Sequence, residues 1–196
     1  MLQKLAKGLL FSGIILSKLG FSQINCEDPN SIESKKDWLF SDSKVFSKLV
    51  GSWKGEWRRY DSKGDSIPYI INGEEVLVKT SILHQSIDKE NNLWRQTNVY
   101  DQEDFSRNFV GRVLKDGGVI FHNCADEGYE RFEAVAREYG DYHIFWVVKN
   151  IETGIVIYTE DISLTTANER SRIGRRYNYA NGEYVGLTVI HEERID

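Results

Sequence analysis

Short turn signals recur after residue 60, and each separates two segments in which apolar and polar residues alternate. They include Asp-Ser-Lys-Gly-Asp at 61–65, Asn72-Gly73, Gly140-Asp141 and Asn181-Gly182. Such sequences adopt the positive backbone φ angles that tight hairpin turns require. The chain has 16 glycines and only 2 prolines, which suits a sheet because proline interrupts its hydrogen-bond ladder. The series therefore predicts consecutive antiparallel hairpins.

The alternating segments predict the strands individually. We expect strands at 49–60, 67–71, 75–86, 93–100, 105–114, 119–123, 129–139, 142–149, 155–164, 170–179 and 183–194. A short helix is predicted before them, because Val45, Phe46 and Leu49 follow the start signal Ser41-Asp42-Ser43 with helical spacing. A meander of this kind leaves two open sheet edges, and closure removes them. The predicted fold is all-β: one antiparallel up-and-down β-barrel of about eight to ten strands with a short N-terminal helix.

The segment 142–149 is apolar on both of its faces. Ile144 and Trp146 share one face, and Phe145 and Val147 share the other. We therefore expect packing on both sides of this strand, with the N-terminal helix as a candidate for the outer layer.

The first predicted strand repeats a Gly-x-Trp pattern. Gly51, Trp53, Gly55 and Trp57 lie on one of its faces. Glycine inside a strand marks a bend or a close approach, and a neighbouring indole can fill the space that it leaves. One interpretation is structural, with both tryptophans plugging one end of the barrel. The other is that Trp57 lines a ligand cavity.

The first residues resemble a secretory signal peptide. Lys4 and Lys7 precede an apolar run from Gly8 to Leu16, which is too short to span a bilayer as a helix. We predict a signal peptide at 1–22, a linker at 23–40 and the barrel domain at 41–196, hence export to a periplasm, a thylakoid lumen or the medium. The alternative is an uncleaved N-terminal helix, which would be the protein's one membrane contact, or a cytoplasmic or stromal location. Export would allow a disulfide between Cys26 and Cys124, which otherwise stay as two thiols.

Charge and motifs exclude several classes of function. The formal net charge is −5 without a basic stripe, which argues against a nucleic-acid partner. The sequence has no H-E-x-x-H, G-x-S-x-G or C-x-x-C motif and no glycine-rich phosphate loop. We therefore predict no catalytic residue and no metal site.

Three short motifs follow one another along the chain: Trp53–Asp61 reads W-x-G-x-W-x-R-Y-D, Gln96–Tyr100 reads Q-T-N-x-Y, and Arg175–Glu183 echoes residues 58–65. Together they resemble an uncharacterised calycin-like family of cyanobacteria and plastids. The likeness covers about residues 45–196, and there is a more remote similarity to biliprotein chromophore lyases. It implies a lipocalin-like barrel that could hold an open-chain tetrapyrrole.

The expected function is non-catalytic binding of a small hydrophobic or amphipathic molecule inside the barrel. A tetrapyrrole, a fatty acid or a pigment would fit, with its carboxylate paired to an inward arginine. The candidate ligand-binding residues are Trp53, Trp57, Arg95, Tyr100, Arg131, Trp146 and Arg176. Alternatively, these arginines pair with acids on neighbouring strands at the surface.

Two other functions stay open. One is an enzyme on the same barrel, either a chromophore lyase or a heme-dependent activity with His143 or His191 as the axial ligand. The other is a structural barrel that its own side chains fill, without a ligand.

Overall fold

The computed structural model describes residues 39–103, 105–113, 118–123, 132–165 and 169–196. Within these residues ten strands form one antiparallel barrel. They are β1 (Gly51–Asp61), β5 (Lys79–Asp88), β6 (Leu93–Tyr100), β7 (Phe105–Val113), β8 (Val119–Asn123), β9 (Phe132–Tyr139), β10 (His143–Asn150), β11 (Val156–Leu164), β12 (Ser171–Ala180) and β13 (Glu183–Arg194).

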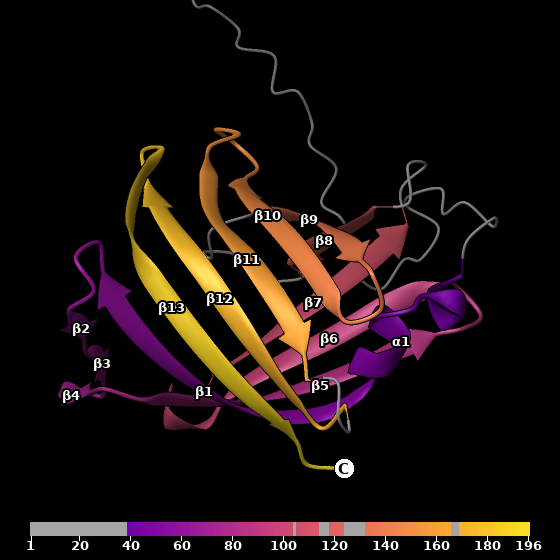
Figure 1. Cartoon of the computed structure of the whole chain (residues 1–196), viewed down its shortest axis with the longest axis horizontal. Coiled ribbons are helices and arrows are strands. Elements are labelled where there is room, and N and C mark those ends of the chain that lie inside the picture. Colours follow the sequence, from indigo (N-terminus) through magenta and orange to yellow (C-terminus); the bar gives the residue numbers. More distant parts are fainter. Residues whose placement is uncertain (1–38, 104, 114–117, 124–131, 166–168) are drawn as a thin grey trace, which may run out of the picture.

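The barrel is closed by the first and last strands. From β5 to β13 each strand pairs with the next along the chain, and β13 then pairs with β1, where Trp57 lies opposite Ile190. β1 pairs with β5 on its other side, where Trp53 lies opposite Leu83. Closure leaves no unpaired edge in the ring (Figure 1), which confirms the predicted all-β up-and-down barrel.

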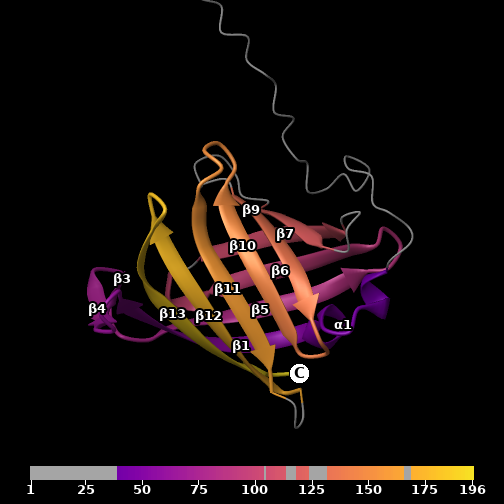
Figure 2. The same cartoon turned by 45° about the horizontal axis from the view of Figure 1, so that its top comes forward.

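The meander has one excursion, between β1 and β5. Its strands are β2 (Ser66–Ile67), β3 (Tyr69–Ile71) and β4 (Glu74–Val76). β2 pairs briefly with β1, whereas β3 and β4 form a separate hairpin beside the end of β1 (Figures 1 and 2). The predicted single strand at 75–86 is therefore wrong at Leu77 and Val78, because β4 belongs to the hairpin and β5 to the barrel.

Other strand bounds follow the predictions closely. The predicted strands at 93–100, 119–123 and 183–194 match β6, β8 and β13 at both ends. The predicted start of the strand at 129–139 lies outside the described residues, which resume at Phe132 in β9. A further short 3-10 helix, η3 (Asp101–Glu103), follows β6.

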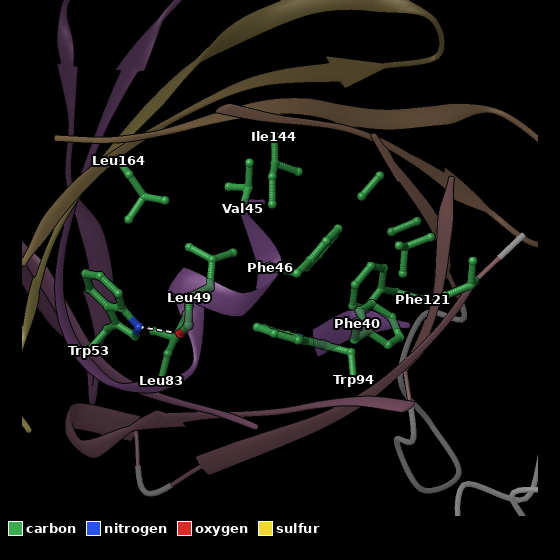
Figure 3. Close-up of a cluster of buried hydrophobic side chains, with 14 of the residues drawn as sticks. Phe40, Val45, Phe46, Leu49, Trp53, Leu83, Trp94, Phe121, Ile144 and Leu164 are labelled. Atoms are coloured by element: carbon green, nitrogen blue, oxygen red, sulfur yellow. Dashed lines mark hydrogen bonds between the residues drawn. The ribbon is translucent and has the colours of Figure 1, made fainter. Parts of the chain in front are cut away.

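The N-terminal helical segment lies inside the barrel. It consists of the 3-10 helix η2 (Phe40–Asp42) and the single-turn α1 (Phe46–Leu49). Figure 3 shows α1 within the ring of strands, with its apolar side chains directed at the surrounding strands. Oε1 of Glu138, on β9, accepts the backbone N–H groups of Val45 at 3.0 Å and Phe46 at 2.9 Å, as well as the Ser43 hydroxyl. The carboxylate thus satisfies donors that a helix start leaves unpaired.

Phe46 is the centre of the core at this end. Its ring centroid lies 5.4 Å from Trp94, 6.0 Å from Phe121 and 6.4 Å from Trp146. The helix therefore packs against the inner, Trp146 face of β10, and the expected outer position of the helix was wrong. The physical reason is volume, since a ring of ten strands is too wide for the strands' own side chains to fill.

Several sequence predictions lie outside the described residues. These are the signal peptide at 1–22, the linker up to residue 38, Cys26, Cys124 and Arg131. No helix in the described part of the chain combines the length and the apolar character needed to cross a bilayer.

Candidate ligand-binding cavities in the barrel

A cavity of about 260 Å³ opens at the end of the barrel away from α1, and we call it the mouth cavity. Its walls come from the last residues of β1 and β6, the first residues of β5 and β7, residues of β12 and β13, the η3 residue Glu103 and the hairpin residue Tyr69. Four aromatic side chains line it, namely Trp57, Tyr69, Tyr100 and Phe105. Four basic side chains also line it, namely Arg59, Lys79, Arg107 and Arg176.

The aromatic walls are held by ring contacts. Tyr100 and Phe105 stack with centroids 6.1 Å apart and planes at 13°, and Trp57 meets Tyr100 edge to face at 6.2 Å. Tyr69 packs against the cluster of Trp57 and Tyr100, and the guanidinium carbon of Arg59 lies 4.6 Å from its ring centroid. Burial raises the pKa of Tyr69 to about 12, so its hydroxyl is protonated at neutral pH.

The basic groups of the mouth differ in their partners. Lys79 forms an ion pair with Glu103, with Nζ to Oε2 at 2.7 Å. Nη2 of Arg59 donates to the carbonyl oxygen of Pro68 at 3.1 Å, while its buried Nε has no hydrogen-bond acceptor. No carboxylate in the described part of the chain pairs with Arg59. Its positive charge is therefore held at an aromatic cavity by a neutral carbonyl and a ring.

A second cavity of about 80 Å³ lies deeper in the barrel, and we call it the inner cavity. One side is apolar and includes Phe109, Phe121, Phe132 and Trp146. The other side is polar and includes Gln85, Gln96, Asn98, Glu160, Arg172 and Glu192. The inner cavity thus has less than a third of the volume of the mouth cavity.

Two buried ion pairs border the inner cavity, and each joins residues that lie directly opposite in the sheet. Arg172 pairs with Glu192 through its Nε, and Arg176 pairs with Glu160 at 2.9 Å. Burial by itself would lower the pKa of Arg176, but the negative charge of Glu160 raises it above its ordinary value. Both guanidinium groups are therefore fixed, charged parts of the interior.

Trp57 and Arg176 line both cavities and lie between them. The guanidinium carbon of Arg176 is 4.9 Å from the indole centroid, and Trp57 Nε1 donates to Ser81 Oγ at 2.7 Å. Gly55 makes room for this contact, since a Cβ at Gly55 would lie 3.0 Å from Ser81 Oγ and 3.2 Å from Trp57 Nε1. The expected role of this glycine as a close approach is confirmed.

The sequence-predicted site residues fall into three groups. Trp57, Tyr100, Trp146 and Arg176 line one or both cavities. Trp53 is buried at the α1 end, and Arg95 pairs with Asp88 at 3.1 Å away from both cavities. Arg131 lies outside the described residues.

The Gly-x-Trp pair therefore has two environments. Trp53 lies beside α1, where its Nε1 donates to the carbonyl oxygen of Leu49 at 2.8 Å, as the plug interpretation expects. Trp57 lies four residues further along β1 at the cavities, as the ligand interpretation expects.

Sequence reasoning missed the amides and part of the mouth. Gln96 and Asn98 lie two residues apart and share one face of β6 with Trp94 and Tyr100. The pattern does not identify that face as the inner one. Tyr69 was not a candidate because residues 67–71 read as a single ordinary strand, and its wall position depends on the hairpin.

The described histidine side chains line neither cavity. His84 contacts Ser52 Oγ at 3.0 Å, His143 contacts Ser163 Oγ at 2.9 Å, and His191 is exposed. The described residues hold no cluster of histidine, cysteine and acidic side chains suited to a metal ion. An axial histidine for a heme in these cavities is not available among them.

Comparisons with known proteins add little to this geometry. No protein-family model matches the chain, and no curated protein matches it. One similar solved structure is a protein of unknown function from the DUF3598 family of Nostoc punctiforme, with 16% identity and a TM-score of 0.49. The match covers 76% of this chain and 48% of that chain, so it spans about half of that protein's length. The resemblance to calycins and chromophore lyases stays a prediction.

Proposed function

We propose that the protein binds a small amphipathic molecule with an anionic group in the mouth cavity. The observation that carries this proposal is Arg59, whose charge lies at an aromatic-lined cavity without a carboxylate partner in the described residues. An uncompensated cation in such a place is costly, and an anionic ligand would stabilise it with charge-assisted hydrogen bonds. Non-catalytic binding is the expected activity.

Cavity volume limits the size of the ligand. The volume of about 260 Å³ lies just below the roughly 300–1,000 Å³ of typical small-molecule pockets, which suits a single ring system or a short chain. A tetrapyrrole or a long fatty acid would place only one ring or one end in this cavity. The four aromatic walls favour a flat, apolar ligand body.

Charge selects the sign of the ligand. Among the described residues that line the mouth, Glu103 is acidic, and Lys79 neutralises it. Arg59 adds a positive charge that no carboxylate of the described residues pairs with, while Arg176 is balanced by Glu160. The net field at the mouth is thus positive, although the whole chain carries −5. A field of this kind favours anions over neutral or cationic ligands of the same shape.

The experiment compares three naphthalene probes of nearly equal shape. We expect saturable binding of 2-naphthoate, weaker binding of neutral 2-naphthamide and no binding of 2-(aminomethyl)naphthalene. Tryptophan fluorescence follows the titration, and Trp57→Phe removes the quenching that arises in the mouth. Equal affinities for all three probes, or no binding of 2-naphthoate, would contradict the proposal and favour a barrel that functions without a ligand.

A matched pair of variants tests the role of Arg59. Arg59→Met removes the charge but keeps an apolar stem, and we expect it to weaken 2-naphthoate binding about tenfold with little effect on 2-naphthamide. Arg58→Met is the control, because Arg58 is exposed and pairs with Glu56 at 3.0 Å. Equal losses in the two variants would remove Arg59 from the site.

A further inference from the structure

A continuous chain of side-chain hydrogen bonds links the buried ion pair to the mouth cavity. Arg172 Nη1 donates to Gln85 Oε1 at 2.8 Å, and Gln85 Nε2 donates to Gln96 Oε1 at 2.6 Å. Gln96 Nε2 donates to Asn98 Oδ1 at 2.8 Å, and Asn98 Nδ2 donates to the Tyr100 hydroxyl oxygen at 3.4 Å. The chain crosses from β12 to β5 and β6 and ends at a mouth residue.

The direction of this chain is fixed at its buried end. A guanidinium can only donate hydrogen bonds, so Gln85 must present its carbonyl oxygen to Arg172. The NH₂ group of Gln85 then points to Gln96, which accepts with its carbonyl oxygen. Gln96 in turn donates with its NH₂ group to the carbonyl oxygen of Asn98. Arg172 itself cannot turn away, because it is fully buried and paired with Glu192.

Tyr100 therefore receives a hydrogen bond on its oxygen and keeps its own proton for another acceptor. Among the described residues the hydroxyl makes one hydrogen bond, the one from Asn98, so its proton is left for an acceptor outside them. The Tyr100 side chain is nearly buried, lines the mouth and meets Asn98 of the inner cavity, so its hydroxyl lies at the floor of the mouth.

We infer that Tyr100 donates a hydrogen bond to an acceptor oxygen of the bound ligand, and that the chain from Arg172 fixes this polarity. The inference rests on the proposed function and specifies it. The ligand class is a flat carboxylate or other oxyanion whose acceptor reaches the floor of the mouth. A ligand that presents an N–H donor there meets another donor and is rejected.

One substitution far from the mouth reverses the chain. In Gln85→Glu the carboxylate accepts from Arg172 with one oxygen and from the Gln96 NH₂ group with the other. Gln96 and Asn98 then flip, Asn98 presents its oxygen to Tyr100, and the Tyr100 proton turns inward. The added negative charge lies beside Arg172, away from the ligand. Gln85→Met is the control, since it breaks the chain without reversing it.

A double-mutant cycle with 2-naphthoate isolates this effect from the added charge. We expect Gln85→Glu to weaken binding about tenfold, Gln85→Met to weaken it less, and Tyr100→Phe to weaken it about tenfold. In the Tyr100→Phe background Gln85→Glu should have almost no further effect. An equal loss in both backgrounds would overturn the inference, while wild-type binding would leave the proposed function intact. Failure of the wild type to bind would overturn both.

A readout without ligand tests the polarity directly. In the wild type, nuclear Overhauser effects should connect the Asn98 NH₂ protons with the Tyr100 ring. In Gln85→Glu they should connect the Asn98 NH₂ protons with the Gln96 side chain instead. An unchanged Asn98–Tyr100 contact in a folded Gln85→Glu variant would overturn the inference whatever the binding data show.

Discussion

Trp53 and Arg194 lie near the two ends of the described chain and meet where the barrel closes. The guanidinium carbon of Arg194 is 4.5 Å from the Trp53 ring centroid, and Arg172 covers the same indole at 4.2 Å. Arg194 also donates to the carbonyl oxygens of Lys48 and Val50, while Trp53 donates to that of Leu49. The final strand thus binds the end of α1, whose last carbonyls need partners.

Replacement of Arg194 should therefore lower the free energy of unfolding more than replacement of a surface arginine does. We expect Arg194→Ala to lower the free energy of unfolding by about 2–4 kcal/mol, because it removes two backbone partners and the cover of a buried indole. Urea denaturation measures the difference. Arg175→Ala is the control, since Arg175 is exposed and pairs with Asp161 on neighbouring β11, and it should cost at most about 1 kcal/mol. Equal losses would mean that the closure contact contributes little.

The buried ion pair between Arg172 and Glu192 makes a different prediction. Arg172→Met leaves the Glu192 carboxylate buried without its partner, and we expect a loss of about 3–5 kcal/mol. The double variant Arg172→Met/Glu192→Met removes both charges, and it should be about as stable as the wild type or more stable. Chemical denaturation of the three proteins tests this. A double variant less stable than Arg172→Met would contradict the desolvation argument.

Sequence reasoning identified the fold because turn chemistry is local. The Asn-Gly and Gly-Asp signals set the hairpins, and a consecutive meander has closure as its simplest way to remove edges. The helix was also foreseen, from the spacing of Val45, Phe46 and Leu49. Its place inside the barrel was not, because spacing identifies an apolar side of a helix without identifying the surface that it packs against.

The candidate site was only partly predictable for a similar reason. Alternation assigned Arg172 and Arg176 to one face of their strand but not to the interior. For Arg176 the sequence left two outcomes open, an inward side chain and a pair with an acid of a neighbouring strand. The structure shows both at once, and the Arg172–Glu192 pair is likewise buried. The partners Glu192 and Glu160 depend on strand register, which a long-range closure sets and a local pattern does not.

The buried hydroxyl of Tyr158 should make the protein less stable at alkaline pH. Its hydroxyl lies in the interior, where burial raises its pKa to about 12 although the nearby Arg176 charge opposes the shift. An unfolded tyrosine ionises near pH 10, so above about pH 10 the unfolded state binds fewer protons than the folded state. Ionisation of Tyr158 therefore leaves the free energy of unfolding unchanged below about pH 10. Between about pH 10 and pH 12 it lowers that free energy by up to about 1.4 kcal/mol per pH unit.

Two variants separate this effect from the titration of other groups. Tyr158→Phe keeps the ring beneath Arg176 and should show a shallower fall in unfolding free energy over the same pH interval. Tyr184→Phe is the control, because Tyr184 is exposed, and its pH profile should follow the wild type. A Tyr158→Phe profile parallel to the wild type would show that this hydroxyl ionises equally in both states.

Gly111 on β7 leaves no room for a larger side chain, because it lies against Phe121, which belongs to the core and also lines the inner cavity. A Cβ at Gly111 would lie 2.5 Å from Cε1 of Phe121, a ring that is itself held 4.4 Å from Trp146. Gly111→Ala should therefore displace Phe121 and cost about 1–3 kcal/mol of unfolding free energy, measured by urea denaturation. Phe121→Leu makes room, so adding Gly111→Ala to it should cost much less than adding it to the wild type. Strictly additive losses would mean that the backbone at Gly111, and not the Phe121 ring, excludes the methyl group.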